Sequence, residues 1–77
     1  MSKNSQVQKK KILSDFAAKV RNRRNALGLT QEELAEKANC HVNYIGGIER
    51  ATRNPSLTII ISIAKALEVP SKELMPN

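Results

Sequence analysis

A chain of 77 residues is long enough for one small domain, because a second domain would have no hydrophobic core of its own. Hydrophobic residues make up 40% of the chain and the only aromatic residues are Phe16 and Tyr44, so the predicted core is aliphatic. The single Cys40 excludes an internal disulfide. No apolar run approaches the length of a membrane span and no signal-peptide pattern opens the chain, so we expect a reducing, cytoplasmic setting and no membrane partner.

The positive charge is concentrated in the first third of the chain. The net charge is +6, and residues 1–24 contain eight basic residues against one acidic residue, a net charge of +7. Such asymmetry favours attraction to a polyanion, of which the phosphate backbone of a nucleic acid is the commonest. The alternative is a basic tail that only keeps the protein in solution.

The first predicted elements are a basic arm and one helix. Residues 1–10 are polar and lack periodicity, which predicts a flexible arm, and residues 11–77 are expected to form the folded domain. Gly28 is well placed to end the first helix near Leu27. The residues of this helix that recur at helical spacing are Leu13, Phe16, Ala17, Val20, Arg24 and Leu27.

Two short helices joined by a tight turn are predicted within residues 30–49. Thr30 and Glu33 form a capping-box pattern, and Asn39 suits a left-handed turn. His41 is placed to cap the second of these helices, although it is a weaker cap than Ser, Thr or Asp. The predicted inward residues are Leu34, Ala35, Ala38, Ile45 and Ile48, and the predicted outward residues are Val42, Asn43, Gly46 and Gly47. Two helices at this spacing indicate a helix-turn-helix, which makes nucleic acid the first partner to consider.

A polar loop and a fourth helix follow. Pro55 favours an extended Asn54, and Ser56 is a plausible N-cap. The predicted inward stripe of this helix is Leu57, Ile60, Ile61, Ala64 and Leu67, and residues 71–75 are expected to add a last helical turn or two. The predicted fold is therefore all-α, a compact bundle of four to five short helices.

The fourth helix has more apolar residues than one buried face needs. Ile59 and Ile63 fall near a second edge, and together with Val69, Leu74 and Met75 they predict an apolar patch suited to a symmetric homodimer. The alternative is a wide core stripe covered by the last helical turn.

Four segments resemble one family in order and spacing. They are VRNRRNALGLTQEELAEKA at residues 20–38, YIGGIER at residues 44–50, RNPSL at residues 53–57 and IAKALEV at residues 63–69. The chain resembles the lambda-repressor-like, XRE/Cro-type helix-turn-helix transcription factors. Its length and the YIGGIERATRN segment are also similar to the controller proteins of restriction–modification systems. This resemblance implies a bacterial, phage or plasmid protein that binds double-stranded operator DNA as a homodimer, without a cofactor.

The resemblance implies that the helix near Val42 enters the major groove. The residues expected to read bases are then Val42, Asn43, Tyr44 and Gly47, with Arg53 reading a base or the width of a groove. The residues expected to contact phosphates are Gln31, Arg50, Thr52, Asn54, Arg21 and Arg23; for each of these the alternative is an ordinary solvated side chain.

Arg24 and Glu49 have a different expected role. Arg24 falls on the inward stripe, and Glu49 matches the acidic residue with which family members form a buried ion pair. The pair is expected to be structural, because an unpaired buried charge is costly. For Gly46 and Gly47 two compatible explanations stay open: close packing inside the protein, or close approach of the helix to DNA.

Other functions have less support in the sequence. Cys40 and His41 lack the number and spacing of zinc ligands, so no metal site is predicted, and no catalytic set is visible. Glu32, Glu33 and Glu36 form an acidic strip that is a possible contact for an RNA polymerase sigma factor, with a solvated helix face as the favoured alternative. The competing function is an antitoxin that binds a toxin and also its own promoter.

Overall fold

The computed structural model describes residues 2–76, with side chains described for residues 8–76. Over these residues the chain forms α1 (Ser2–Ala26), α2 (Gln31–Ala38), α3 (Val42–Glu49), α4 (Leu57–Ala66) and the short 3-10 helix η1 (Ser71–Glu73). No strand is present in this described part of the chain, and the all-α prediction is confirmed. No helix within these residues is both long and apolar enough to cross a bilayer.

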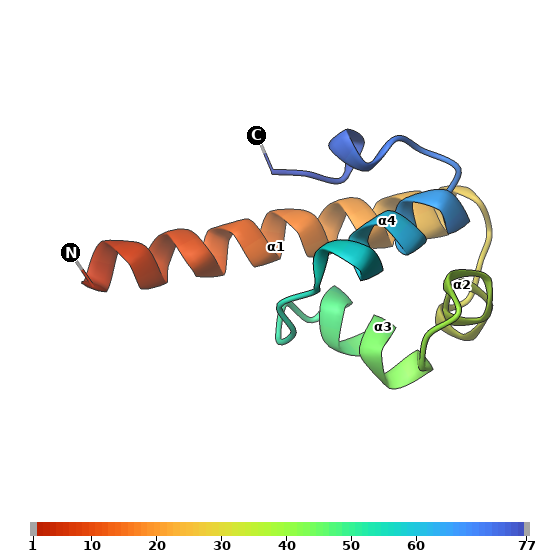
Figure 1. Ribbon diagram of the computed structural model, residues 1–77, viewed down its shortest axis with the longest axis horizontal. Helices are drawn as coiled ribbons and strands as arrows, with labels where there is room; N and C mark the ends of the chain where they lie inside the picture. The colour runs from red at the N-terminus through yellow and green to blue at the C-terminus, as the bar shows by residue number, and fades with distance from the viewer. Residues whose placement is uncertain (1, 77) are drawn as a thin grey trace.

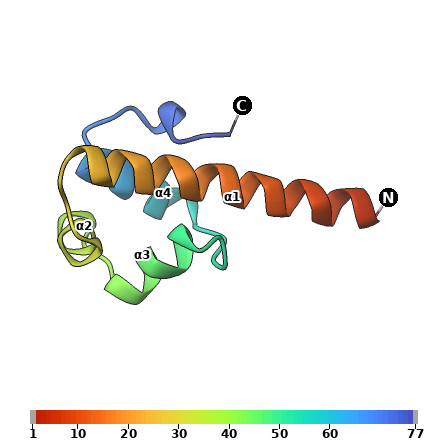
Figure 2. The ribbon, with the colours of Figure 1, turned by 180° about the vertical axis from the view of Figure 1, so that it is seen from behind.

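The helices pack around one aliphatic core. In Figure 1, α1 runs across the domain, with α2 and α3 below it, α4 beside it and the segment of η1 above it, and Figure 2 shows the same arrangement from behind. The N-terminal half of α1 projects past the other helices. The molecule is correspondingly elongated, with extents of 39 × 23 × 20 Å. The largest fully buried side chains are Val20, Leu34, Ile45, Ile48, Ile63, Leu67 and Leu74. The helix-turn-helix therefore shares its core with α1 and α4.

Each α-helix ends in the same way, with one residue in the left-handed conformation. These residues are Gly28 (φ 71°), Asn39 (φ 56°), Ala51 (φ 60°) and Glu68 (φ 60°). After each of them the next backbone N–H donates back into the helix, from Leu29 to Arg24, from Cys40 to Ala35, from Thr52 to Gly47 and from Val69 to Ala64. This pattern is the Schellman motif, which satisfies carbonyl groups that would otherwise have no partner at the helix end.

The predicted caps are confirmed by their hydrogen bonds. Thr30 and Glu33 form the full capping box, with both bonds present at 2.8 and 3.0 Å. The Nδ1 atom of His41 accepts from the Asn43 N–H at 3.0 Å, and Ser56 Oγ accepts from the Ile59 N–H at 3.3 Å. The start of α2, α3 and α4 is thus fixed by local side chains.

The face that α4 presents to the core differs from the prediction. Leu57 and Ile61, predicted to be buried, are 70% and 40% exposed, whereas Ile63 and Leu74, predicted for a dimer surface, are 0% and 2% exposed. The residues that face the core are Ile60, Ile63, Ala64 and Leu67, which keep the helical spacing but rotate the stripe. The prediction that Ile63 and Leu74 contact a second protomer is therefore wrong, because both side chains fill the core of their own chain.

The beginning of α1 also differs. The helix begins at Ser2 rather than near residue 11, so the predicted arm at residues 1–10 is helical from Ser2, while Met1 lies outside the described residues. Apolar periodicity detects only the part of a helix that packs on a core, and the side chains of residues 8–12 are exposed.

Candidate nucleic-acid interface

A buried ion pair holds α3 against α1 and α2. Arg24 Nε donates to Glu49 Oε2 at 2.7 Å and Arg24 Nη2 donates to Oε1 at 2.9 Å, so the pair is bidentate. Gln31 Nε2 donates to the same carboxylate at 3.1 Å, and Arg24 Nη1 donates to the Leu29 carbonyl at 2.8 Å. The predicted structural pair is present, and it joins three helices at one carboxylate.

The electrostatics of Glu49 follow from this geometry. Burial by itself would raise the pKa of Glu49, but the hydrogen bonds from Arg24 and Gln31 and the charges of Arg24 and Arg21 lower it below the ordinary value of 4.5. The carboxylate is therefore ionised and fully partnered at neutral pH. α3 is therefore held by a charge network at its C-terminal end, on the side away from Asn43.

The outer edge of α3 carries few side chains. Asn43 is exposed, and Val42 and Tyr44 are half-buried where they pack on the edge of the core. Among these three predicted base-reading residues, Asn43 is the one that is exposed. An amide in this position can donate and accept at once to the edge of an adenine.

The two glycines of α3 lie beneath arginine side chains. A Cβ atom placed on Gly47 would collide with Arg53 Cγ, and one placed on Gly46 would meet Arg50 Nη1 at 3.0 Å. Both glycines are buried, so the prediction that they are exposed on the outer face is wrong. A contact between Gly47 and bases stays a prediction, since the side chain that covers this glycine is that of Arg53. Their function in the fold is to give room for the two arginines to lie along the helix. In the sequence, only the contact between Gly46 and Arg50 could have been anticipated, because residues four apart on a helix lie on the same face.

Arg53 is also held by an aromatic ring. Its guanidinium carbon lies 5.3 Å from the centroid of the Tyr44 ring, within the range of a cation–π contact. Gly47 and Tyr44 thus position Arg53 beside the exposed edge of α3. Sequence reasoning placed Arg53 near DNA but did not find these two contacts.

The remaining predicted phosphate ligands divide into two groups. Arg50 and Asn54 are exposed in the loop after α3, next to Arg53. Thr52 instead closes the helix, since its Oγ1 donates to the Gly47 carbonyl at 3.1 Å. Gln31 has one amide hydrogen bonded to Glu49, which leaves only the other for a phosphate.

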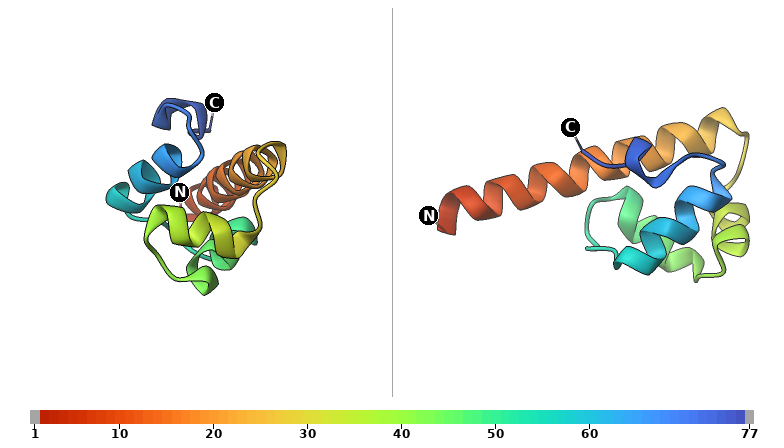
Figure 3. Two further views of the ribbon diagram at one scale, coloured as in Figure 1. Left: turned by 90° about the vertical axis from the view of Figure 1, so that its right-hand side faces the viewer. Right: turned by 45° about the horizontal axis from the view of Figure 1, so that its top comes forward.

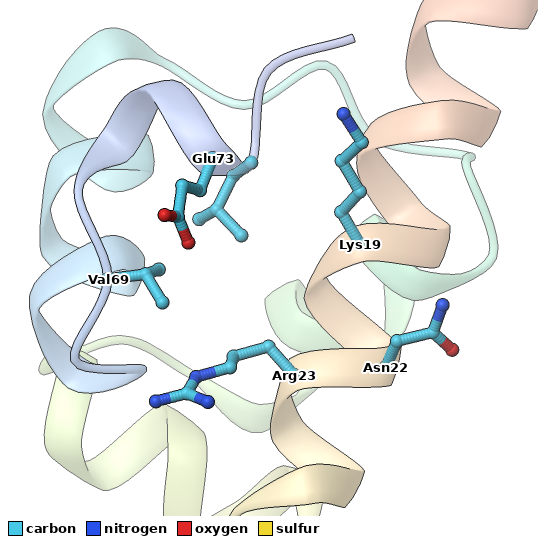
Figure 4. Close-up of a pocket in the computed structure, with 6 residues that line it drawn as sticks. Lys19, Asn22, Arg23, Val69 and Glu73 are labelled. Carbon is cyan, nitrogen blue, oxygen red and sulfur yellow. The ribbon is translucent and has the colours of Figure 1, made fainter.

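Arg21 and Arg23 lie on different sides of α1. Arg21 Nη1 donates to the Glu49 carbonyl at 3.0 Å, at the end of α3, and the residue is exposed. Arg23 Nε donates to the Leu67 carbonyl at 2.9 Å, at the end of α4. Figure 4 shows Arg23 and Lys19 along a hollow opposite Val69 and Glu73, in the region of η1 rather than of α3. Arg21 is therefore brought to the candidate interface and Arg23 is not.

Cys40 and His41 have structural positions. Burial raises the pKa of the Cys40 thiol, and the side chain packs against the core. Within the part of the chain that the structure describes, no three His, Cys, Asp or Glu residues are grouped so that they could hold a metal ion.

The family comparisons agree with this geometry. The "Helix-turn-helix" family model matches residues 20–74. Control protein C.SmaI of Serratia marcescens is 43% identical over 60 residues, which is 78% of this chain and 71% of that protein.

Two solved structures of restriction–modification controller proteins are similar. C.AhdI of Aeromonas hydrophila matches with a TM-score of 0.80 and 41% identity over 82% of this chain and 96% of that chain. C.Esp1396I, solved as a tetramer in complex with its natural 35 base-pair operator, matches with a TM-score of 0.72 and 41% identity over 75% and 76% of the two chains. The chain belongs to the XRE-type helix-turn-helix family of DNA-binding transcription regulators, and restriction–modification controller proteins are among its relatives.

Proposed function

We propose that this chain is a sequence-specific DNA-binding regulator of the controller type, which acts as a homodimer on a pseudo-palindromic operator of a restriction–modification operon. The observation that carries the proposal is the exposed edge of α3 with Arg50, Arg53 and Asn54 beside it, held in place by the Arg24–Glu49 pair. The identity of 43% to a control protein and the operator-bound tetramer of C.Esp1396I support it.

The division of labour within the interface follows from the chemistry of the side chains. Asn43 and Arg53 present the directional donors and acceptors that distinguish base pairs. Arg50, Arg21 and Asn54 are exposed around the same edge and supply contacts to phosphates, together with the free amide hydrogen of Gln31. Val42 and Tyr44 add apolar contact. With so few base-reading side chains, the shape of the DNA and the spacing of two half-sites carry much of the specificity.

The dimer surface is assigned to the apolar residues that the fold leaves exposed. Leu57 and Ile61 are one helical turn apart on α4, so their side chains lie on the same face. The half-buried Ile59, Val69 and Met75 remain candidates for its edges. A two-fold dimer presents two recognition helices about 34–36 Å apart, which matches half-sites one turn apart on DNA. Two such dimers on adjacent sites would give a tetramer.

Contact with RNA polymerase would use the acidic strip on α2. Glu32 and Glu36 are exposed and one turn apart, whereas Glu33 is bonded to the Thr30 N–H at 2.8 Å. If this strip touches a sigma factor, replacing Glu32 and Glu36 by Gln should lower activated transcription without changing operator affinity, which paired reporter and binding assays would measure.

The main experiment is selection of bound sites from random duplex DNA, followed by footprinting upstream of the chain's own gene. The expected result is enrichment of a dyad, a site made of two half-sites related by two-fold symmetry. Failure to enrich any dyad would overturn the proposal. A paired test compares Asn43→Ala with Arg50→Ala on the selected site. The first should cost about 1–3 kcal/mol and relax preference at one position, whereas the second should weaken binding to all sequences equally.

A further inference from the structure

Most of the cations on α1 already have partners within the protein. The partnered side chains are Lys11 with Asp15 at 3.5 Å, Lys19 with the Met75 carbonyl at 2.6 Å, Arg21 with the Glu49 carbonyl, Arg23 with the Leu67 carbonyl and Arg24 with the Glu49 carboxylate. Five of the eight basic residues at positions 1–24 therefore make a contact inside the fold. Lys11 and Arg24 are paired with carboxylates, whereas Arg21 is exposed and keeps further N–H donors for a phosphate.

Lys9 and Lys10 are different. Both are exposed, and among the described side chains neither has a carboxylate within ion-pair distance. Both line a shallow hollow with Leu13 and Ala51, and Lys9 lines a second hollow with Asn54. Ala51 and Asn54 belong to the loop that carries Arg50 and Arg53. The two lysines thus continue the basic surface of that loop onto α1.

The position of these lysines is set by the helix and not by a loose arm. α1 passes over the loop after α3 and continues beyond it, as Figures 1 and 3 show. Residues 2–14 contain four lysines and no acidic residue, so this half of α1 is uniformly basic. The match to the helix-turn-helix family begins only at residue 20, so this segment lies outside the shared domain.

We propose that Lys9 and Lys10 form a second phosphate-binding surface, which holds the duplex DNA backbone beside the contacts that the loop after α3 makes. The inference rests on the proposed function, and it extends the DNA footprint beyond the helix-turn-helix. A lysine is a compact point charge with three donors, which suits phosphate contact without sequence readout. Because the helix presents both residues beside the loop, the contact would need little ordering of the chain.

The test compares two double variants of the full chain. Lys9→Gln/Lys10→Gln removes the proposed contacts, and glutamine has nearly the helix propensity of lysine. Lys65→Gln/Lys72→Gln is the matched control, since it loses the same charge at exposed positions on α4 and η1 that line neither hollow. Binding is measured against salt concentration on the selected dyad and on a scrambled duplex of the same length.

The expected result is specific to the Lys9→Gln/Lys10→Gln variant. It should bind both duplexes more weakly than wild type and the control do, by a similar factor. The slope of log affinity against log salt should fall by about 0.9 for each phosphate contact removed, while the preference for the dyad over a scrambled site is kept. Equal slopes for the two double variants would overturn the inference and leave the operator proposal intact. If wild type selects no dyad at all, the proposed function fails first and the inference fails with it.

Discussion

Glu49 is the only charged residue that is buried among the described residues, and Arg24 and Gln31 both donate to it. Leaving one member of a buried pair without its partner costs about 3–5 kcal/mol, which is a large share of the stability of a small domain. The network therefore matters for the fold first. Its effect on DNA binding is indirect, because it fixes the orientation of α3 relative to α1 and α2.

The network predicts a particular response to acid. The pKa of Glu49 lies below 4.5 in the folded protein, whereas the unfolded carboxyl has its ordinary value of 4.5. The folded state thus favours the ionised form, and this contribution to the free energy of unfolding is complete above pH 4.5 and is lost as the pH falls through the folded pKa. We expect Glu49→Gln to be less stable than wild type by roughly 3 kcal/mol at neutral pH, with a difference that shrinks in acid.

Urea unfolding of wild type and Glu49→Gln, at neutral pH and below pH 4.5, measures the difference between their free energies of unfolding. Glu33→Gln is the control, because the hydrogen bonds from the Thr30 backbone and side chain also lower the pKa of Glu33, but at an exposed site. Its effect should have the same sign and be smaller. A stability difference between Glu49→Gln and wild type that stays constant with pH would contradict the prediction.

Gly47 predicts a separation of stability from binding. Gly47→Ala should favour the helix by up to about 1 kcal/mol, but its Cβ would occupy the place of Arg53 Cγ and displace that side chain. Because the Cγ atom lies near the backbone and not at the free end of the side chain, we expect the clash to offset the gain in helix propensity, with little net change in stability. The operator should be bound more weakly, by on the order of 1–3 kcal/mol, the value of one bidentate base contact. Thermal unfolding and a binding titration together measure both effects.

Gly46→Ala is the matched control for this variant. Its Cβ would meet only the Nη1 end of Arg50 at 3.0 Å, and the end of a flexible side chain moves at little cost. We therefore expect a smaller loss of affinity. Equal operator affinity for wild type and Gly47→Ala would show that the position of Arg53 does not contribute to binding.

At the scale of single residues the sequence predicted pairs that depend on spacing along one helix or on family resemblance. The capping box and the Arg24–Glu49 pair were found in this way. The contact of Arg53 with Tyr44 was missed, because it depends on the path of a loop that reverses after the helix end. No periodic pattern encodes that path.

At the scale of elements, some helix ends could be predicted from the sequence and others could not. Gly28 and Asn39 were predicted as helix ends because those residues adopt the left-handed conformation easily. Ala51 and Glu68 adopt the same conformation without that preference, so composition gave no signal for them. For L-residues with a Cβ the left-handed conformation costs about 1–2 kcal/mol. The surrounding Schellman hydrogen bonds offset this cost at both positions.

Glu68 therefore offers a stabilising substitution. Glu68→Gly removes the strain of a Cβ at φ 60° and should raise the free energy of unfolding by about 0.5–1 kcal/mol, after the added entropy of the unfolded glycine is counted. For a domain of this size the melting temperature should rise by roughly 4 °C. Glu68→Ala is the control, because it removes the charge but keeps the Cβ. Equal melting temperatures for the glycine and alanine variants would contradict the strain argument.

The orientation of α4 could not be predicted from its sequence. With apolar residues at most positions of Leu57–Ala66, more than one stripe satisfies helical periodicity, and only packing against α1, α2 and η1 selects between them. The existence of the helix, its N-cap at Ser56 and the core positions of Ala64 and Leu67 were predicted correctly. Which isoleucine faces the solvent was not.

At the scale of the whole molecule that rotation changes where a second copy would bind. The fold leaves Leu57 and Ile61 exposed at 70% and 40% on one face of α4, and burying such side chains is worth about 1.5–3 kcal/mol each when it is complete. A two-fold contact uses the same patch on both protomers, so each substitution acts twice. Introducing a charge there should therefore separate the protomers without unfolding either one.

We expect Leu57→Lys/Ile61→Lys to sediment as a monomer at concentrations where wild type is a dimer. Thr58→Lys adds a charge at an exposed position on a neighbouring face of the same helix and should remain dimeric. On DNA the double variant should keep the affinity of wild type for an isolated half-site, because α3 and its loop are untouched, but lose most of the gain that two linked half-sites give. If the double variant still sediments as a dimer, the interface lies elsewhere, and Ile12, which is 50% exposed on α1, is the next candidate.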